Sequence, residues 1–270
     1  MKVLDHGFVQ LVSKTGHVGL SVTNAARCSY GSTSDDLGEK DRKLIAYLLS
    51  HGHTSPFRHA FFTFHVKAPL FVFRQWWKYQ VGSTWREYAA NAIAEPKPCG
   101  RTMGHGLSCV KGYECSDACA GRVPIEVQAA DIQIDTDQGC SWNELSGRYK
   151  VMEPEFYMPA AARRNSGRQA SEDADDESLT KRMQDHMRRA QVSAVKKYEA
   201  MLKDGVAKEL ARLVLPPSIY SECYWTVSLQ AVLHFLDQRL KEDAQFEIRQ
   251  YAQAVLDLIR PDLEEMGVTP

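Results

Sequence analysis

"HAFFTFHVKAPLFVFRQWWKYQVGS", residues 59–83, contains the two patterns that decide the fold. Bulky side chains alternate with smaller or polar ones over its first ten positions, and a side-chain period of two is that of a β-strand. Pro69 then stands where a helix would begin, a position at which its missing N–H is tolerated. The stretch therefore predicts a strand that passes directly into a helix over 69–80.

Further elements are predicted on both sides of this stretch. Residues 7–13 and 16–22 alternate apolar and polar side chains, so each is a predicted strand. Residues 34–52 start with acidic and cap-type residues, carry an apolar stripe and end at Gly52, which predicts a helix.

The C-terminal half is predicted to be helical. Residues 163–180 are polar and mixed in charge, which is typical of a linker or surface loop. Periodic apolar positions then predict helices over 176–205, 207–218, 224–240 and 242–259, with Pro261 closing the last. The predicted fold class is α+β, with a small mixed or antiparallel sheet and a helical C-terminal half.

Composition indicates an ordinary globular protein. The 270 residues are 44% hydrophobic and 25% charged, with a net charge of -1, so no basic field implies a nucleic-acid partner. No long apolar run is present and the N-terminus does not resemble a signal peptide, so we expect a cytoplasmic protein without a membrane partner.

Five of the seven cysteines lie between 99 and 140, a segment without clear periodicity. Cys115 and Cys119 have zinc-ligand spacing, whereas Cys99 and Cys109 do not, so both structural zinc and free thiols remain open. His51 and His53 lack a carboxylate or cysteine at ligand spacing, which favours a polar loop over a metal site. Of these interpretations we favour free thiols and a polar loop, and we therefore predict no metal.

"CSWNELSGRYK", residues 140–150, concentrates hydrogen-bonding groups around one glycine. Glu144, Ser146 and Arg148 could bind a phosphate and an amide-bearing ring, and Gly147 would allow a close approach of backbone to ligand. The alternative is a polar turn joined by an ion pair between Glu144 and Arg148.

Cations also lie on helical segments. Arg74 and Lys78 are one turn apart and would share a face, although the aromatic residues around them could simply be core. Arg212 and Arg239 stand in apolar stretches and need an anion, either a ligand or a nearby carboxylate. Glu209 is the candidate for Arg212, and Asp237 or Asp243 for Arg239.

Taken together, these segments resemble the flavin-dependent thymidylate synthase family. The matching stretches, in order, are "NAARCSY", "HGHTSPFRHAFFTFHVKAPLFVFRQWW", "SWNELSGRYKVMEPEFYMP", "ELARLVLPPSIY", "YWTVS" and "AQFEIRQYA". The resemblance implies reductive methylation of uridylate at C5, with FAD, NADPH and methylenetetrahydrofolate. It also implies a homotetramer with active sites between subunits.

The family signature is split in this chain. Its first part ends at Ser83 and it resumes at Ser141, so we predict one domain over 1–270 with an insertion at about 84–140. By this resemblance the uridine nucleotide would be held by Gln75, Lys78, Glu144, Ser146, Gly147, Arg148, Arg212 and Arg239. Arg239 would be catalytic, because charge-assisted hydrogen bonds to the uracil carbonyls make C5 more nucleophilic. No covalent protein nucleophile is predicted.

The flavin positions depart from the family pattern. Ser29 and Ser55 match flavin-contacting hydroxyls and Lys78 keeps a charge, whereas the remaining positions carry Tyr79, Gln80, Ser228, Gln230 and His234 in place of the usual residues. This pattern resembles a branch of the family that methylates UMP or dUMP for a nucleoside antibiotic, polyoxin. The alternatives are ordinary dTMP synthesis and a nucleotide-binding protein that has lost catalysis.

Overall fold

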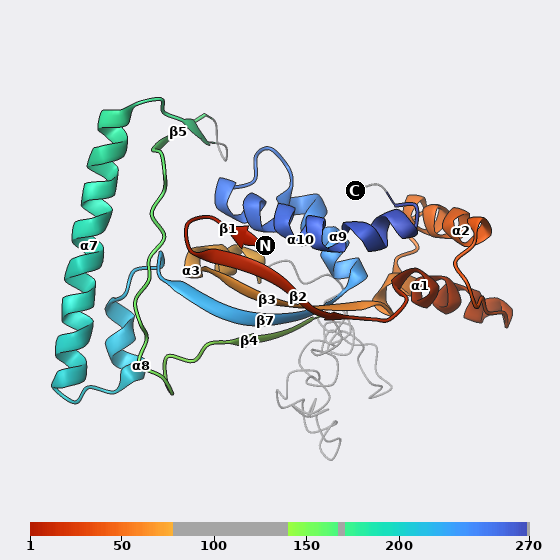
Figure 1. The fold of residues 1–270 in the computed structure, drawn as a ribbon, viewed down its shortest axis with the longest axis horizontal. Helices are drawn as coiled ribbons and strands as arrows, with labels where there is room; N and C mark the ends of the chain where they lie inside the picture. Colours follow the sequence, from red (N-terminus) through yellow and green to blue (C-terminus); the bar gives the residue numbers. More distant parts are fainter. Residues whose placement is uncertain (78–139, 167–170, 269–270) are drawn as a thin grey trace, which may run out of the picture. The chain divides into compact units, whose positions relative to one another are not determined.

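A five-stranded sheet organises the protein, whose computed structural model describes residues 1–77, 140–166 and 171–268 (Figure 1). Its strand order is β1-β2-β3-β7-β4, and the pairs from β1 to β7 are antiparallel. The strands are β1 (Lys2–Val3), β2 (Gly7–Lys14), β3 (Phe61–Pro69), β7 (Tyr220–Ser228) and β4 (Cys140–Glu144).

The pair β3–β7 is the longest in the sheet. Its register runs without a shift from Phe61 opposite Ser228 to Pro69 opposite Tyr220. Alternate side chains such as Phe64 and Trp225 are fully buried on one face, with ring centroids 5.6 Å apart. The predicted strand over this stretch is confirmed, because the period of two in the sequence follows this alternation.

Five helices accompany the sheet: α1 (Val18–Arg27), α2 (Glu39–Ser50), α3 (Leu70–Trp76), α9 (Leu229–Arg239) and α10 (Phe246–Glu265). Helix α9 packs against β7 and α10 against β1 and β2 (Figure 1). Trp76 of α3 stacks on Phe235 of α9 at 4.7 Å and meets Trp225 edge-on at 5.2 Å. These large rings make the core, where their burial stabilises the fold.

The remaining elements follow β4 in the chain or connect the main helices. They are the 3-10 turns η1 (Cys28–Tyr30), η2 (Ser55–Arg58) and η4 (Arg212–Val214), the hairpin strands β5 (Arg163–Asn165) and β6 (Ser171–Asp173), and the helices α7 (Glu177–Lys203) and α8 (Lys208–Ala211). Helix α7 packs against α8 and η4. The α+β class, the antiparallel sheet and the helical C-terminal half are confirmed.

The predicted strand over 16–22 is wrong, because this segment belongs to α1. Val18 and Val22 are spaced both as alternate residues and as neighbours one helical turn apart, so the pattern fits either structure. Helix packing decides the outcome. Gly19 lies against the end of α10, where an added Cβ would come within 2.7 Å of Leu37 and 2.9 Å of Met266.

Two boundaries also differ from prediction. The predicted helix over 224–240 begins only at Leu229, because residues 224–228 pair with β3 and Ser228 caps the helix by accepting from Ala231 N at 3.3 Å. The predicted linker over 163–180 contains the β5–β6 hairpin and the first turn of α7. Strand pairing between segments far apart in the sequence overrides local periodicity here.

Pro261 does not end the last helix as predicted, since α10 continues to Glu265. A proline inside a helix removes one backbone hydrogen bond and destabilises it by about 3 kcal/mol. Long-range packing offsets this loss. Leu263 is buried, and Lys14 of β2 forms an ion pair of 2.6 Å with Asp262.

Residues 1–77 and the described residues from Ser141 onward belong to one compact unit. The helix predicted over 69–80 is seen from Leu70 to Trp76. The insertion predicted at about 84–140 lies outside the described residues, apart from its last residue, so the proposed single domain with an insertion stays a prediction.

Candidate functional site

The end of β4 is fixed to β7 by two hydrogen bonds. Ser221 Oγ donates to Glu144 Oε1 at 2.8 Å, and Leu145 N donates to Glu222 O at 2.8 Å. The loop that follows therefore starts from a fixed point on the sheet.

This loop, residues 145–150, folds back on Ser146. The Ser146 carbonyl accepts from Tyr149 N at 3.2 Å, and its hydroxyl accepts from Arg148 N at 3.3 Å. The hydroxyl thus helps to order the backbone of the loop.

Gly147 is buried where the loop meets Arg212 of η4. A Cβ at this position would lie 3.0 Å from Arg212 Cδ and 3.1 Å from Met152 Sδ. The glycine predicted for close approach is therefore used to place the Arg212 side chain beside the loop.

The predicted polar turn joined by Glu144 and Arg148 is not what the structure shows. Glu144 is bonded to Ser221, and Arg148 Nε pairs with Glu209 Oε2 at 2.9 Å, with both partners largely exposed. Glu209, the predicted carboxylate for Arg212, is therefore used by Arg148. Within the described residues, Arg212 has no ion pair.

A cavity of about 320 Å³ lies on one side of this loop, and we call it the Arg212 cavity. Its lining residues are Leu70, Arg74, Trp77, Glu144, Leu145, Met152, Arg212, Leu213, Leu215 and Ile219. Its volume falls in the range of ligand sites, roughly 300–1,000 Å³. The side chains of Arg74 and Arg212 form no hydrogen bond or ion pair within the described part of the chain, so two guanidinium groups border this space without a carboxylate partner.

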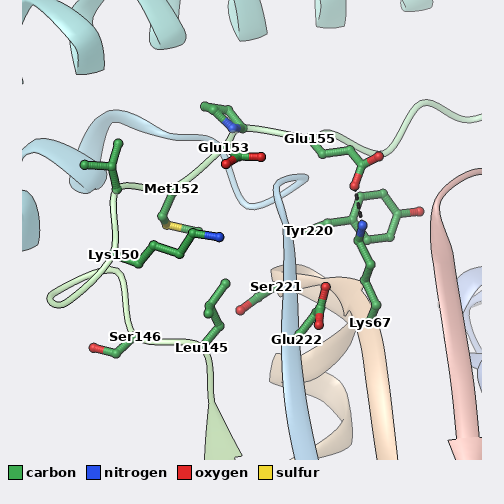
Figure 2. A pocket seen from close by; sticks show the side chains of 12 residues that line it. Lys67, Leu145, Ser146, Lys150, Met152, Glu153, Glu155, Tyr220, Ser221 and Glu222 are labelled. Carbon is green, nitrogen blue, oxygen red and sulfur yellow. Dashed lines mark ion pairs between the residues drawn. The ribbon is translucent and has the colours of Figure 1, made fainter.

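A second cavity, of about 560 Å³, shares Leu145 and Met152 with the first, and we call it the Lys67 cavity. Figure 2 shows Lys150 reaching into it from the loop and Lys67 from β3 on the opposite side. Lys67 is paired with Glu155 at 2.5 Å, which in turn lies 3.1 Å from His6 Nδ1. The Lys67 charge is thus compensated, so the Arg212 cavity is the better anion site.

Gln75 and Arg239 are brought together at the end of α3. Arg239 Nη2 donates to the Gln75 carbonyl at 3.4 Å, and the Gln75 side chain is hydrogen-bonded to Gln245. Asp237, one predicted partner of Arg239, lies 3.8 Å from Lys241.

Three of the predicted flavin residues, Ser55, Ser228 and Gln230, lie around the start of α9. Gln230 Oε1 accepts from Arg58 Nε at 2.6 Å, and Gln230 Nε2 donates to Thr54 Oγ1 at 2.9 Å. These bonds tie α9 to η2, whose first residue is Ser55. Ser228, as described above, caps α9.

The other predicted flavin residues are more dispersed. Ser29 lies in η1, directly after α1. Helix α1 packs against η2. His234 is exposed on α9. Lys78, Tyr79 and Gln80 lie outside the described residues.

The donor set around η2 fits a flavin nucleotide chemically. The Arg58 guanidinium and the hydroxyls of Ser55 and Thr54 suit phosphate oxygens. Tyr47 stacks on His51 at 4.0 Å at the end of α2 and offers a flat aromatic surface next in sequence to this turn. These residues could hold the cofactor.

The sequence interpretation missed a buried polar cluster beneath Gln75. Glu247 is 1% exposed and is bonded to Arg163, Tyr157 and Gln245. Its signal was a carboxylate between Phe246 and Ile248 in the stretch "AQFEIRQYA", where a fully buried charge requires partners.

Burial raises the pKa of the Cys223 thiol and the nearby Glu144 charge adds to this, so Cys223 stays a neutral core residue. No group of three or more potential metal-binding side chains occurs in the described ranges, which leave out the four clustered cysteines from Cys99 to Cys119. No helix among the described residues has the length and apolar character needed to span a membrane.

Comparison with known proteins gives consistent matches along the chain. The family model described as "Thymidylate synthase complementing protein" matches residues 10–89 and 130–263. A flavin-dependent thymidylate synthase from Thermus thermophilus is 36% identical over 262 residues, covering 96% of this chain and 73% of that protein. The corresponding enzyme of Thermosipho africanus is 33% identical over 261 residues, covering 96% and 88%.

Two solved structures are similar in fold. The UMP/dUMP methylase PolB from Streptomyces cacaoi bound with 5-Br dUMP has a TM-score of 0.66 and 26% identity, covering 98% of this chain and 96% of that chain. The same methylase bound with 5-Br UMP has a TM-score of 0.65 and 24% identity, covering 100% and 99%.

Proposed function

This chain belongs to the flavin-dependent thymidylate synthase family, and from that premise we propose that it methylates UMP and dUMP at C5. The family makes it a flavin-dependent methyltransferase, so the family prediction is confirmed. The observation that carries the proposal is the Arg212 cavity, where two guanidinium groups border a space of nucleotide size. A dianionic phosphate is the ligand group that such a pair accommodates best.

The loop at 145–150 would hold the phosphate end of the nucleotide. Gly147 lets Arg212 approach the loop closely, and Glu144 is fixed by Ser221 so that its carboxylate can accept from a ribose hydroxyl. Holding one reactant in a single orientation is itself a large part of the catalysis of a two-substrate reaction.

Arg239 would act on the uracil ring. A guanidinium that donates to the ring carbonyls stabilises the negative charge that develops on their oxygens, and this favours the attack of C5 on the one-carbon donor. The contact between Arg239 and the Gln75 carbonyl supports this role, because it keeps the guanidinium at a fixed place beside a second predicted nucleotide residue.

We further propose FAD as the resident flavin, methylenetetrahydrofolate as the carbon donor and NADPH as the reductant. The flavin, when bound, supplies the hydride that reduces the transferred methylene to methyl, which no side chain can do. Arg58, Ser55 and Gln230 would bind it around the start of α9, while Ser29 and His234 would contribute from η1 and α9.

A role in nucleoside-antibiotic assembly is the finer part of this proposal. Its support is the similarity to PolB, whose structures hold brominated forms of UMP and of dUMP. If this chain shares that tolerance, methylation of UMP should proceed at a rate comparable to that of dUMP.

We propose a homotetramer with active sites between subunits. Support comes from large apolar side chains on the sheet, where Val12, Phe61 and Tyr224 are 46%, 40% and 47% exposed. Exposed apolar surface of this kind is typical of an interface. Light scattering coupled to size-exclusion chromatography measures the assembly.

The proposal is tested by supplying the purified protein with FAD, NADPH and methylenetetrahydrofolate, and with either UMP or dUMP. We expect a 5-methylated product from both nucleotides. Product from dUMP alone would indicate ordinary dTMP synthesis. A protein that binds uridylate and FAD but forms no product would instead be a nucleotide-binding member that has lost catalysis.

A further inference from the structure

A buried carboxylate lies two hydrogen bonds away from Gln75. Glu247 sits in the first turn of α10 and is almost fully excluded from solvent. Arg163 forms an ion pair with it, and Tyr157 donates to its Oε1 at 3.0 Å. The Glu247 carboxylate faces a guanidinium at bonding distance, and a carboxylate can only accept hydrogen bonds.

This acceptor dictates how Gln245 is oriented. Gln245 Nε2 donates to the second carboxylate oxygen of Glu247 at 2.9 Å. The amide oxygen of Gln245 is then turned toward Gln75 and accepts from Gln75 Nε2. Each amide has one donating and one accepting end, so the direction of the hydrogen bonds from Gln75 through Gln245 follows from the charge on Glu247.

This order of hydrogen bonds leaves one acceptor, on Gln75, at the end opposite Glu247. In the described parts of the protein no donor reaches Gln75 Oε1, and the backbone carbonyl of the same residue holds Arg239 Nη2 at 3.4 Å. A hydrogen-bond acceptor and a guanidinium donor are thus presented by neighbouring groups.

We propose that Glu247 is a positioning residue that makes the site selective for uracil over cytosine. Through Gln245 it turns Gln75 Oε1 toward the uracil N3–H, while Arg239 donates to an adjacent ring carbonyl. This inference rests on the proposed function, because it takes the ring of a uridine nucleotide to lie at Gln75 and Arg239.

Cytosine presents the opposite pattern on the same edge. Its N3 is an acceptor and its C4 amino group is a donor, so N3 would face Gln75 Oε1 and the amino group would face Arg239. A buried site that hydrogen-bonds one partner strongly rejects an analogue that leaves its groups unpaired. We expect the wild-type protein to bind UMP at least about 100-fold more tightly than CMP.

The decisive variant is Glu247→Gln, which keeps the size of the side chain. Arg163 is a donor and must face the remaining oxygen, so the new amide nitrogen is directed at Gln245. Gln245 and then Gln75 must turn over, which presents the Gln75 amide nitrogen to the base. Affinity for UMP should fall by about tenfold or more while affinity for CMP does not fall, and the preference should disappear or reverse.

The experiment uses FAD-loaded protein and titration calorimetry with UMP and CMP. Gln245→Met is the second variant, because it cuts the connection to Gln75 and leaves the contacts of Arg163 and Tyr157 with Glu247 in place. We expect it to lose most of the preference without reversing it. Glu199→Gln, the same chemical change at an exposed position of α7, is the control and should keep the preference.

Circular dichroism and flavin content show that each variant is folded. If both folded variants keep the wild-type preference for UMP, Glu247 does not position Gln75 and the inference is wrong, while the proposed function stands. If the wild-type protein neither prefers UMP to CMP nor methylates uridylate, both the inference and the proposed function are wrong.

Discussion

Gly147 is the residue at which one added carbon should have the largest effect on the site. Its missing side chain leaves the space that the Arg212 side chain and Met152 occupy. The sequence predicted a close approach at this glycine, but it could not reveal that the approaching group is Arg212. That contact joins residues far apart in the chain, and periodicity carries no information about it.

Substituting Gly147→Ala should therefore weaken nucleotide binding more than it affects folding. The new methyl would displace the flexible Arg212 side chain, and we expect affinity for UMP to fall by about tenfold, which corresponds to about 1.4 kcal/mol. Titration calorimetry measures the affinity, and thermal unfolding measures the stability.

Gly16→Ala is the matched control, because no atom lies within 4 Å of a Cβ at Gly16. It should leave the affinity for UMP unchanged. Equal affinity of Gly147→Ala and the wild-type protein would show that the placement of Arg212 beside this loop is not needed for binding.

Site residues differed in how far the sequence could identify them. Arg212 and Arg239 stood out because a cation inside an apolar helical stretch is conspicuous, whereas Gln75 was named as a site residue only through the family resemblance. Gln245 and Glu247 were missed although they lie in a recognised segment. Their importance depends on Arg163, Tyr157 and Gln75, three partners that only the tertiary structure brings together.

At the scale of elements, the junction between η2 and the start of α9 determines where the proposed flavin groups lie. Gln230 bridges Thr54 and Arg58, so it fixes both the helix and the Arg58 guanidinium. The sequence placed Gln230 inside a helix that began too early, because the apolar run through Trp225 and Val227 does not distinguish a buried strand from a helix.

Gln230→Leu should weaken the retention of FAD. The change removes both hydrogen bonds at once and leaves Arg58 free to move, so we expect a lower ratio of flavin absorbance to protein after purification. Gln238→Leu, in the same helix and bonded to Asp237, is the control and should keep the wild-type ratio. Full flavin content in Gln230→Leu would place the cofactor elsewhere.

Elements whose packing is local were predicted well, and those fixed by distant partners were not. Helices α2 and α7 carry their start and stop signals in the sequence, and α7 is followed by Gly205 at a φ of 82°. The continuation of α10 past Pro261 depends on Lys14 and on packing against α1, which no local pattern contains.

At the scale of the whole molecule, three buried tyrosines connect segments that are far apart in the sequence. Tyr157 donates to Glu247 at 3.0 Å, Tyr220 to Asp5 at 2.5 Å and Tyr251 to the Lys67 carbonyl at 2.8 Å. Burial raises the pKa of each phenol above the ordinary value of 10.0, and nearby carboxylates raise it further.

The free energy of unfolding should therefore fall at alkaline pH. The folded chain holds these protons more tightly than the unfolded chain, so the stabilisation is complete below pH 10 and decreases as the pH rises above about 10. Each tyrosine can contribute up to about 1.4 kcal/mol per pH unit. Urea unfolding between pH 8 and pH 11 (about one unit on either side of the tyrosine pKa) measures this decrease.

The variant Tyr157→Phe has one fewer such phenol and should show a smaller decrease with pH than the wild-type protein. A free energy of unfolding that stays constant over this range in the wild-type protein would contradict the burial of these side chains.

The measurement that tests the central claim most directly is a methylation assay with the flavin reduced beforehand. FAD-loaded protein is reduced with NADPH under anaerobic conditions and mixed with methylenetetrahydrofolate and UMP or dUMP, and the nucleotide is analysed by mass spectrometry. We predict a 5-methylated nucleotide from each substrate, formed together with reoxidised flavin. Unchanged nucleotides in the presence of bound, reduced flavin would contradict the account.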